Sequence, residues 1–467
     1  MEINKSVGKK EEEKLLEAIT NNNTKKVKSI LENSNINKIK LNLNEKDEYE
    51  NCPLIIAIEI NNVKIVELLI EYSYQHQIIL NLNEKDEDGN YPLYWAIVNN
   101  NIEIAELLII YANEHQIVLN LNEKDEFGYY PLLMAIFGNN VEMVELLIEY
   151  ANQHQLILNL NEKDEDGNYP VLKAVTENNI EIFKLLIEYA NQHEIILNLD
   201  GKNKHGSNPL LVAIIKNNVE IVELLIIYAN QYRIVLNLNE KNEYGNYPLL
   251  CAVFRNNIEM VELLIEYANQ HQIILNLNEK NVHGNYPLYL AIFNNNVEMV
   301  KLLIEYAKKN NIILELNEKG EYEYEFNPLN IANSNNNIEI VNLLMEYANQ
   351  HKIILNLNEK TKKGDYPLLW ATFNNNVEMV KLLIEYAKQH QIILELNERN
   401  KAKYYPLYFS IFEENIEIIK LLIDYANQHH IALENKKIFA KLICFSQYDI
   451  NELLKNHKKE KEKWEKV

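Results

Sequence analysis

The chain has 467 residues, of which 47% are hydrophobic, and it carries a formal net charge of −22. This acidic balance argues against binding to nucleic acid phosphates or anionic membranes, so we expect partners with basic surfaces. Three widely spaced cysteines (Cys52, Cys251 and Cys444) offer neither a disulfide framework nor a paired metal-ligand motif, which favours a cytoplasmic location and leaves a nuclear one open.

The first predicted element is a charged N-terminal tail over residues 1–13. It has charges where a signal peptide needs an apolar run, and nowhere in the chain do about 18 consecutive apolar residues occur. We therefore expect neither secretion nor a membrane span. A capping unit over 14–52 follows, because Leu15-Leu16-Glu17-Ala18-Ile19 repeats the later pattern with Lys14 in the place of proline.

Ten prolines then divide the chain into units of nearly constant length. Every interval between them is 39 residues except one of 41, and Leu-Leu follows each proline by fifteen and sixteen residues. Such a period is typical of a stacked array rather than a globule. We predict a single solenoid over 14–458, a capping unit at 438–458 and a charged tail at 459–467. The full repeats begin at Pro53, Pro92, Pro131, Pro170, Pro209, Pro248, Pro287, Pro328, Pro367 and Pro406.

The repeat that begins at Pro92 shows two helical patterns around a run of asparagines. Proline suits the first turn of a helix, where its missing N–H has no intrahelical partner. Residues 99–101 are Asn-Asn-Asn, and they end this helix because asparagine tolerates the left-handed backbone of a tight turn. A second helix from Ile102 has one apolar face and exposes Glu103 and Glu106.

A polar connection follows the second helix of each repeat. Residues 117–122, Ile-Val-Leu-Asn-Leu-Asn, alternate like a strand and lead into a turn at Gly128. This pattern predicts a short β-hairpin or finger loop between helix pairs. Glycine lies three residues before proline in seven of ten units, and the sequence leaves the turn type open at Glu50, Glu325 and Lys403.

These residues resemble the ankyrin repeat, whose pattern D-x-x-G-x-T-P-L-H-x-A is matched by Asp125, Gly128, Pro131, Leu132 and Ala135. The resemblance covers ten units and implies an all-α repeat solenoid of ankyrin-type stacked helix pairs with short β-hairpin or finger loops. With both caps we expect about twelve pairs. Three features depart from the family: tyrosine usually replaces the threonine before proline, the following histidine is missing, and asparagine replaces the helix-turn glycine. The period exceeds the family's about 33 residues, which we assign to a second helix extended through Tyr-Ala-Asn-Gln-His.

Two periodic side chains suggest chemistry, but we interpret both as structural. Histidine follows eight prolines by 23 residues, yet repeats about 10 Å apart cannot bring these imidazoles to one metal ion. Tyrosine follows all ten by 19 residues, at the spacing of core side chains. The Leu-Asn-Leu-Asn segments predict an asparagine ladder between fingers. No Walker loop, HExxH or GxSxG motif occurs, so we expect no catalytic residue, no cofactor, no metal and no enzyme activity.

Variation among the repeats concentrates on the fingers and on the ends of the first helices, for instance at Phe137, Thr176, Phe293, Phe373 and Phe412. In the ankyrin family these positions face a concave groove, so the resemblance implies a partner surface there; neutral drift at exposed sites is the alternative. The candidate partner-binding residues are Tyr49, Glu87, Asp88, Glu126, Phe127, Tyr129, Glu165, Asp166, His205, Lys216, Tyr244, Arg255, His283, Tyr322, Tyr324 and Phe326.

Charge gives this surface a direction. The fingers at 45–51, 84–90, 123–129 and 162–168 are acidic, whereas GKNKHGS, EKTKKGD and ERNKAKY are net basic. The 41-residue unit lengthens its finger and adds Tyr322, Tyr324 and Phe326, aromatic residues suited to a binding hot spot.

We therefore predict a monomeric, non-catalytic protein–protein interaction scaffold that binds a protein partner, in particular a basic segment, along the groove of fingers and first helices. No nucleic acid and no membrane partner is expected. Two alternatives stay open: a substrate-recognition arm of a multi-protein enzyme or ubiquitin-ligase complex, and a self-assembling structural protein.

Overall fold

The structure, a computed structural model, describes residues 2–47, 49–320, 325–433, 452 and 455–459. It forms two compact units, unit 1 over 1–236 and unit 2 over 237–467. The division falls inside a Leu-Asn-Leu-Asn segment rather than at a change of composition. That the array acts as one solenoid stays a prediction.

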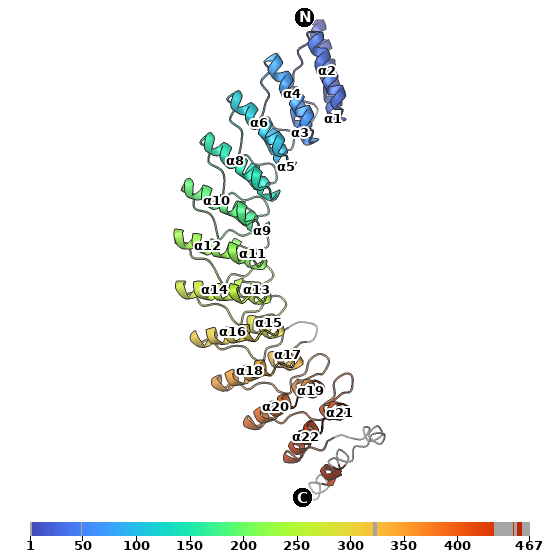
Figure 1. The fold of residues 1–467 in the computed structure, drawn as a ribbon, viewed down its shortest axis with the longest axis vertical. Coiled ribbons are helices and arrows are strands. Elements are labelled where there is room, and N and C mark those ends of the chain that lie inside the picture. The colour runs from blue at the N-terminus through green and yellow to red at the C-terminus, as the bar shows by residue number, and fades with distance from the viewer. Residues whose placement is uncertain (1, 48, 321–324, 434–451, 453–454, 460–467) are drawn as a thin grey trace. The chain divides into compact units, whose positions relative to one another are not determined.

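Unit 1 consists of helix pairs in which a first helix of seven residues precedes a longer second helix (Figure 1). Only its first pair differs, because α1 is the longer helix there. The bounds are α1 Glu2–Thr20, α2 Thr24–Ile36, α3 Pro53–Glu59, α4 Val63–His76, α5 Pro92–Val98, α6 Ile102–Glu114, α7 Pro131–Phe137, α8 Val141–Gln153, α9 Pro170–Thr176, α10 Ile180–Gln192, α11 Pro209–Ile215 and α12 Val219–Tyr232.

Unit 2 repeats this arrangement, which confirms the predicted all-α class of stacked pairs. Its helices are α13 Pro248–Phe254, α14 Ile258–His271, α15 Pro287–Phe293, α16 Val297–Lys309, α17 Pro328–Ser334, α18 Ile338–His351, α19 Pro367–Phe373, α20 Val377–Gln389, α21 Pro406–Phe412 and α22 Ile416–Gln428. Of the predicted capping unit at 438–458 and tail at 459–467, only residues 452 and 455–459 are described.

The N-terminal segment differs from the predicted tail. From Glu2 onward, residues expected to precede the array belong to α1, which continues to Thr20. Lysine and glutamate favour helix, and Lys14 Nζ pairs with Glu11 Oε1 at 2.6 Å along this helix. Glu12 Oε1 accepts the Asn42 N–H at 2.7 Å, which ties the charged segment to the first finger.

The asparagine run between the helices of a repeat bonds to the preceding repeat, adopts a left-handed backbone and caps the second helix. In the repeat of α5 and α6, the Asn99 side chain donates to the Ile58 carbonyl of the preceding repeat at 2.7 Å. Asn100 takes the predicted left-handed backbone, with φ +54°. Asn101 caps α6 by accepting the Ile104 N–H at 3.0 Å, and its amide donates to Asn61 Oδ1 at 2.6 Å. The turn therefore also binds repeat to repeat.

The predicted extension of the second helices through Tyr-Ala-Asn-Gln-His reaches the histidine in α4, α14 and α18 and ends one residue before it in α6, α8, α10, α20 and α22. In α6 the buried Tyr111 hydroxyl accepts the Leu80 N–H at 3.1 Å and donates to the Ile78 carbonyl at 3.0 Å. The rings of Tyr111 and His115 lie 4.2 Å apart at the end of α6. In the next repeat His154 Nε2 lies 2.8 Å from Asn113 Oδ1. These contacts confirm core tyrosines and helix-end histidines.

The predicted hairpin strands are absent from the described part of the chain, where no residue is assigned to a strand. Leu80 and Leu82 alternate into the core, at 1% exposure each. Asn81, between them, donates its N–H to Asn44 Oδ1 at 3.1 Å, and the Asn83 amide donates to the Val118 carbonyl at 2.7 Å. Side chains thus occupy the backbone groups that a second strand would need. The asparagine ladder is confirmed, and the β-hairpin is wrong.

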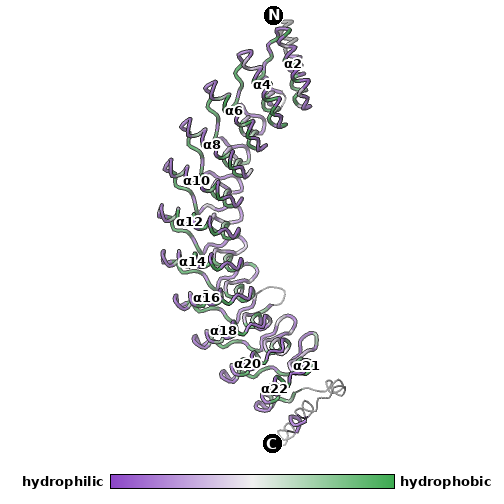
Figure 2. Tube along the Cα trace, viewed as in Figure 1, coloured by the Kyte–Doolittle hydropathy of each residue, from purple (hydrophilic) through white to green (hydrophobic). Residues whose placement is uncertain are grey.

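The core of each repeat lies between its helices and the leucines of its finger. In the repeat that begins at Pro92, Leu93, Ala96, Ile104 and Leu108 are all 0% exposed. Ala96 leaves room for the close approach of helices. Hydrophilic residues line the fingers and turns (Figure 2). The polar residues that differ between repeats therefore lie outside the repeated apolar core.

Candidate partner-binding surface

Each finger turns around an acceptor side chain. In the finger before α7, Asp125 Oδ1 accepts the N–H groups of Phe127 at 2.9 Å and Tyr129 at 2.8 Å. Gly128 has φ +82° and donates its N–H to the Asp125 carbonyl at 3.2 Å. This Asx turn holds Glu126 and Phe127 at the tip.

The turns without glycine adopt the same left-handed backbone. The φ angles are +61° at Glu50, +49° at Glu325 and +69° at Lys403. At this position of the finger, the left-handed backbone therefore occurs both with and without glycine.

Successive tips are joined through the backbone. In unit 1 the Glu165 N–H donates to the Phe127 carbonyl at 3.2 Å, and the Lys204 N–H donates to the Asp166 carbonyl at 2.7 Å. In unit 2 the Val282 N–H donates to the Tyr244 carbonyl at 3.1 Å. These backbone bonds hold the side chains of the joined tips next to one another.

The acidic residues of the unit 1 fingers fall into two groups. Asp86, Asp125 and Asp164 hold the turns with their side chains. Asp166 forms an ion pair with Lys204 at 3.0 Å. The remaining candidates are exposed, and their carboxylates have no hydrogen bond or ion pair in the described part of the chain. These are Glu87, Asp88, Glu126 and Glu165.

Glu59, at the end of α3, joins this acidic surface although the sequence did not single it out. Partial burial raises the pKa of its carboxyl group, and the nearby carboxylates of Asp86, Asp47 and Asp88 raise the pKa further. The charged form of Glu59 is therefore less stable than that of an isolated, fully solvated glutamate. The position of Glu59 at the end of a first helix could have identified it from the sequence.

The aromatic and basic candidates of unit 1 differ in exposure. Tyr49 is 53% and Phe127 is 54% exposed. Tyr129 is half-buried, with its ring 6.3 Å from the ring of Phe137. His205 and Lys216 are exposed.

In unit 2, Tyr244 and His283 lie on successive finger tips, and Arg255 follows α13. All three side chains are exposed. Phe326 is half-buried, with its ring 6.5 Å from that of Trp370. Tyr322 and Tyr324 lie outside the described residues, so of the predicted hot spot only Phe326 is described.

The described residues contain no group of three or more His, Cys, Asp or Glu side chains placed to hold a metal ion. Within that same part of the chain, every helix is too short or too polar to cross a membrane.

Comparison with known proteins places these repeats in a family. A family model described as ankyrin repeats (3 copies) matches residues 15–120, 114–194, 153–235, 232–313, 268–353, 309–393 and 329–435. Among solved structures, the ankyrin repeat domain of Bcl-3, described as a unique member of the IkappaB protein family, matches with 21% identity and a TM-score of 0.39. The match covers 55% of this chain and 99% of that one. No curated protein matches.

Proposed function

The chain belongs to the ankyrin repeat family, and on this premise we propose that it is a non-catalytic scaffold that binds a basic segment of a protein partner along the fingers and first helices of unit 1. Ankyrin repeats are generally protein–protein interaction modules. The family is typically non-catalytic.

The proposal rests on the difference between acidic side chains that hold the finger turns and acidic side chains that are exposed to solvent. The side chains of Asp86, Asp125 and Asp164 hold the turns, whereas the carboxylates of Glu87, Asp88, Glu126 and Glu165 are exposed and have no partner among the described residues. The raised pKa of Glu59 marks the same region as rich in negative charge. Exposed charges of one sign attract an oppositely charged partner, and they do so less as salt increases.

A quadruple charge reversal of Glu87, Asp88, Glu126 and Glu165 to lysine tests the proposal. The probe is a fluorescein-labelled 15-residue Lys/Arg-rich peptide, titrated by anisotropy with the full chain at physiological salt. We expect binding to weaken at least about tenfold. Circular dichroism checks that the variant keeps its helices.

The matched control reverses Glu103, Glu106, Glu142 and Glu145, four exposed residues on α6 and α8. It changes the net charge by the same amount but leaves the fingers intact. Binding close to that of the unaltered chain is expected for this control. Equal weakening in both variants would assign the effect to net charge alone, and no weakening in either would reject the surface.

We further propose that the scaffold is monomeric. Light scattering of the full chain should then give a mass near 55.0 kDa. A mass that is a multiple of this value would favour a self-assembling structural protein instead.

A further inference from the structure

Six aromatic side chains in unit 2 form a connected row of rings over α19, α21 and the finger between their repeats. Trp370 lies 5.8 Å from Phe373, and Phe373 lies 5.0 Å from Phe409. Tyr404 and Tyr408 lie 5.0 and 5.6 Å from Phe409, and Tyr408 stacks with Phe412 at 6.3 Å. We name these residues the aromatic row.

Much of this row faces solvent. Phe373 is 51%, Phe412 is 62% and Tyr404 is 37% exposed. Large exposed aromatic groups gathered on one face, with charged residues at their edge, mark interaction sites rather than core.

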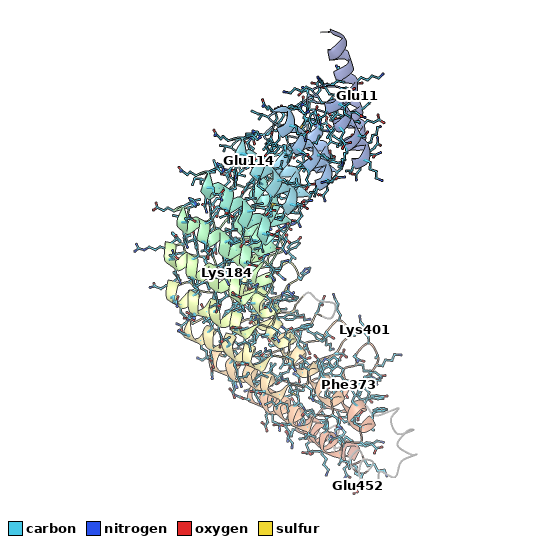
Figure 3. All side chains as sticks on the ribbon, turned by 45° about the horizontal axis from the view of Figure 1, so that its top comes forward. Glu11, Glu114, Lys184, Phe373, Lys401 and Glu452 are labelled. Carbon is cyan, nitrogen blue, oxygen red and sulfur yellow. The ribbon has the colours of Figure 1, made fainter. Side chains whose placement is uncertain are left out.

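The finger edge of the row is basic. Lys362, Lys363, Lys401 and Lys403 are exposed on the two fingers that precede α19 and α21. The Lys401 N–H donates to the Lys363 carbonyl at 2.8 Å, so the two tips lie side by side. Lys362 pairs with Glu325 at 3.0 Å, whereas the Lys401 and Lys403 ammonium groups have no carboxylate partner in the described part of the chain. Figure 3 shows Phe373 and Lys401 on the same side of unit 2.

The opposite edge of the aromatic row is negatively charged. Glu413 and Glu414 follow Phe412 at the C-terminal end of α21, and both are exposed. An elongated ligand on the row therefore meets lysines at the finger edge and glutamates at the end of α21.

Trp370 shows that one polar group within the row lacks an internal acceptor. In unit 1 the equivalent Trp95 donates its indole N–H to Asp86 Oδ2 at 2.7 Å. Nine residues before Trp370 stands Thr361, and the Trp370 indole N–H has no hydrogen-bond acceptor in the described part of the chain. This N–H is itself buried, so the part of the row open to a ligand is formed by Phe373, Phe412 and Tyr404.

We propose that the aromatic row and its lysine edge bind an acidic peptide segment that carries aromatic side chains. Its rings pack on Phe373 and Phe412, while its carboxylates face Lys401 and Lys403. This surface rests on the proposed scaffold function, but it selects a charge opposite to that selected by the unit 1 fingers.

Four fluorescein-labelled 12-residue peptides test the proposal by anisotropy with the full chain. They are Asp/Glu with phenylalanine, Asp/Glu with serine in its place, Lys with phenylalanine, and a neutral Ser/Gly peptide. The acidic phenylalanine peptide is expected to bind at least about tenfold more tightly than each of the others. Equal binding of the acidic and basic phenylalanine peptides would overturn the proposal.

Variants locate the contact. Phe373→Ser with Phe412→Ser, and separately Lys401→Glu with Lys403→Glu, should each weaken the acidic phenylalanine peptide roughly tenfold. The lysine variant alters only exposed side chains, so it keeps the test decisive if the aromatic variant unfolds. Phe137→Ser is the matched control, since Phe137 ends α7 as Phe373 ends α19 and is 50% exposed. Unchanged affinity in the lysine variant would also overturn the proposal.

The two proposals fail separately. If the Lys401→Glu, Lys403→Glu variant binds the acidic phenylalanine peptide unchanged while reversal of the unit 1 tips still weakens the basic peptide, the scaffold function stands and this surface is rejected. If the unaltered chain binds neither the basic peptide nor the acidic phenylalanine peptide specifically, both proposals are rejected.

Discussion

The tyrosine hydroxyls of the second helices serve backbone groups that the extended fingers bring into the core. In unit 1 the Tyr150 hydroxyl accepts the Leu119 N–H at 3.0 Å and donates to the Ile117 carbonyl at 3.3 Å. Leu119 is buried at 2% exposure, so water cannot replace this acceptor. The Tyr150 hydroxyl thus makes the backbone hydrogen bonds that a neighbouring strand would otherwise make.

Tyr150→Phe should lower the free energy of unfolding by about 1–3 kcal/mol, because the buried Leu119 N–H loses its acceptor. Urea denaturation measures the loss, and hydrogen exchange should show faster exchange at the Leu119 amide. Tyr49→Phe, at a tyrosine that is 53% exposed, is the control and should change stability by less than about 0.5 kcal/mol. Similar losses in both variants would contradict the hydroxyl's role.

The two described cysteines should be inert in the folded chain. Burial raises the pKa of the Cys251 thiol to about 12, although Arg255 acts in the opposite direction, and burial also raises the pKa of Cys52. Because the thiolate is the reactive form, alkylation of Cys251 at pH 8 should be roughly a thousandfold slower than in urea. Peptide mapping by mass spectrometry measures each site, and equal rates with and without urea would refute the burial.

At the scale of the element, the finger turn is set by an acceptor side chain and a left-handed residue. Gly89 and Gly167 both have positive φ, +83° and +79°, but their surroundings differ. A Cβ at Gly89 would meet nothing within 4 Å, whereas one at Gly167 would lie 2.8 Å from the Lys202 carbonyl oxygen of the next finger. The pair separates backbone strain from contact between fingers.

Gly89→Ala should cost about 1–2 kcal/mol, the strain of a left-handed alanine. Gly167→Ala should cost at least about 1 kcal/mol more, because the Lys202 carbonyl must move. Thermal unfolding of the two variants measures the difference. Identical losses would show that successive tips are not held together at this position.

At the scale of the molecule, the main helix–helix contacts in the described part of the chain join each helix to its own pair partner and to the adjacent repeats. In unit 1, α7 contacts α5, α8 and α9, and α8 contacts α6, α7 and α10. Stability in such arrays is the sum of repeat and nearest-neighbour terms.

Leu147→Ala, at a fully buried residue of α8, should cost about 2–5 kcal/mol. Its effect should be greatest in α7, α8 and the adjoining repeats, and should fade toward α1 and α2. Native-state hydrogen exchange resolved by segment tests this pattern. A uniform loss of protection across unit 1 would indicate that the unit unfolds as one block.

Much of the fold follows from local rules. The prolines predicted every first helix from α3 to α21, since proline fits only the first turn, and the asparagine runs predicted where these helices end. The predicted β-hairpin was wrong. Leu80 and Leu82 are buried in alternation, and this pattern is the same whether the backbone bonds to a second strand or, as here, to side chains. The site was predicted less well: Asp86 and Glu87 are alike in sequence, and only the turn geometry distinguishes the structural carboxylate from the exposed one.

The sequence by itself determined the repeat, the order and bounds of most helices, and the change from acidic to basic fingers, because these depend on local backbone preference and composition. Tertiary structure alone decided which polar groups are consumed within the array and which reach solvent. The surroundings of Glu59 and of the aromatic row depend on residues from adjacent repeats that lie far away in the chain, such as Asp86 beside Glu59 and Phe409 beside Phe373. Spacing along the chain can name such residues, but only packing shows what they touch.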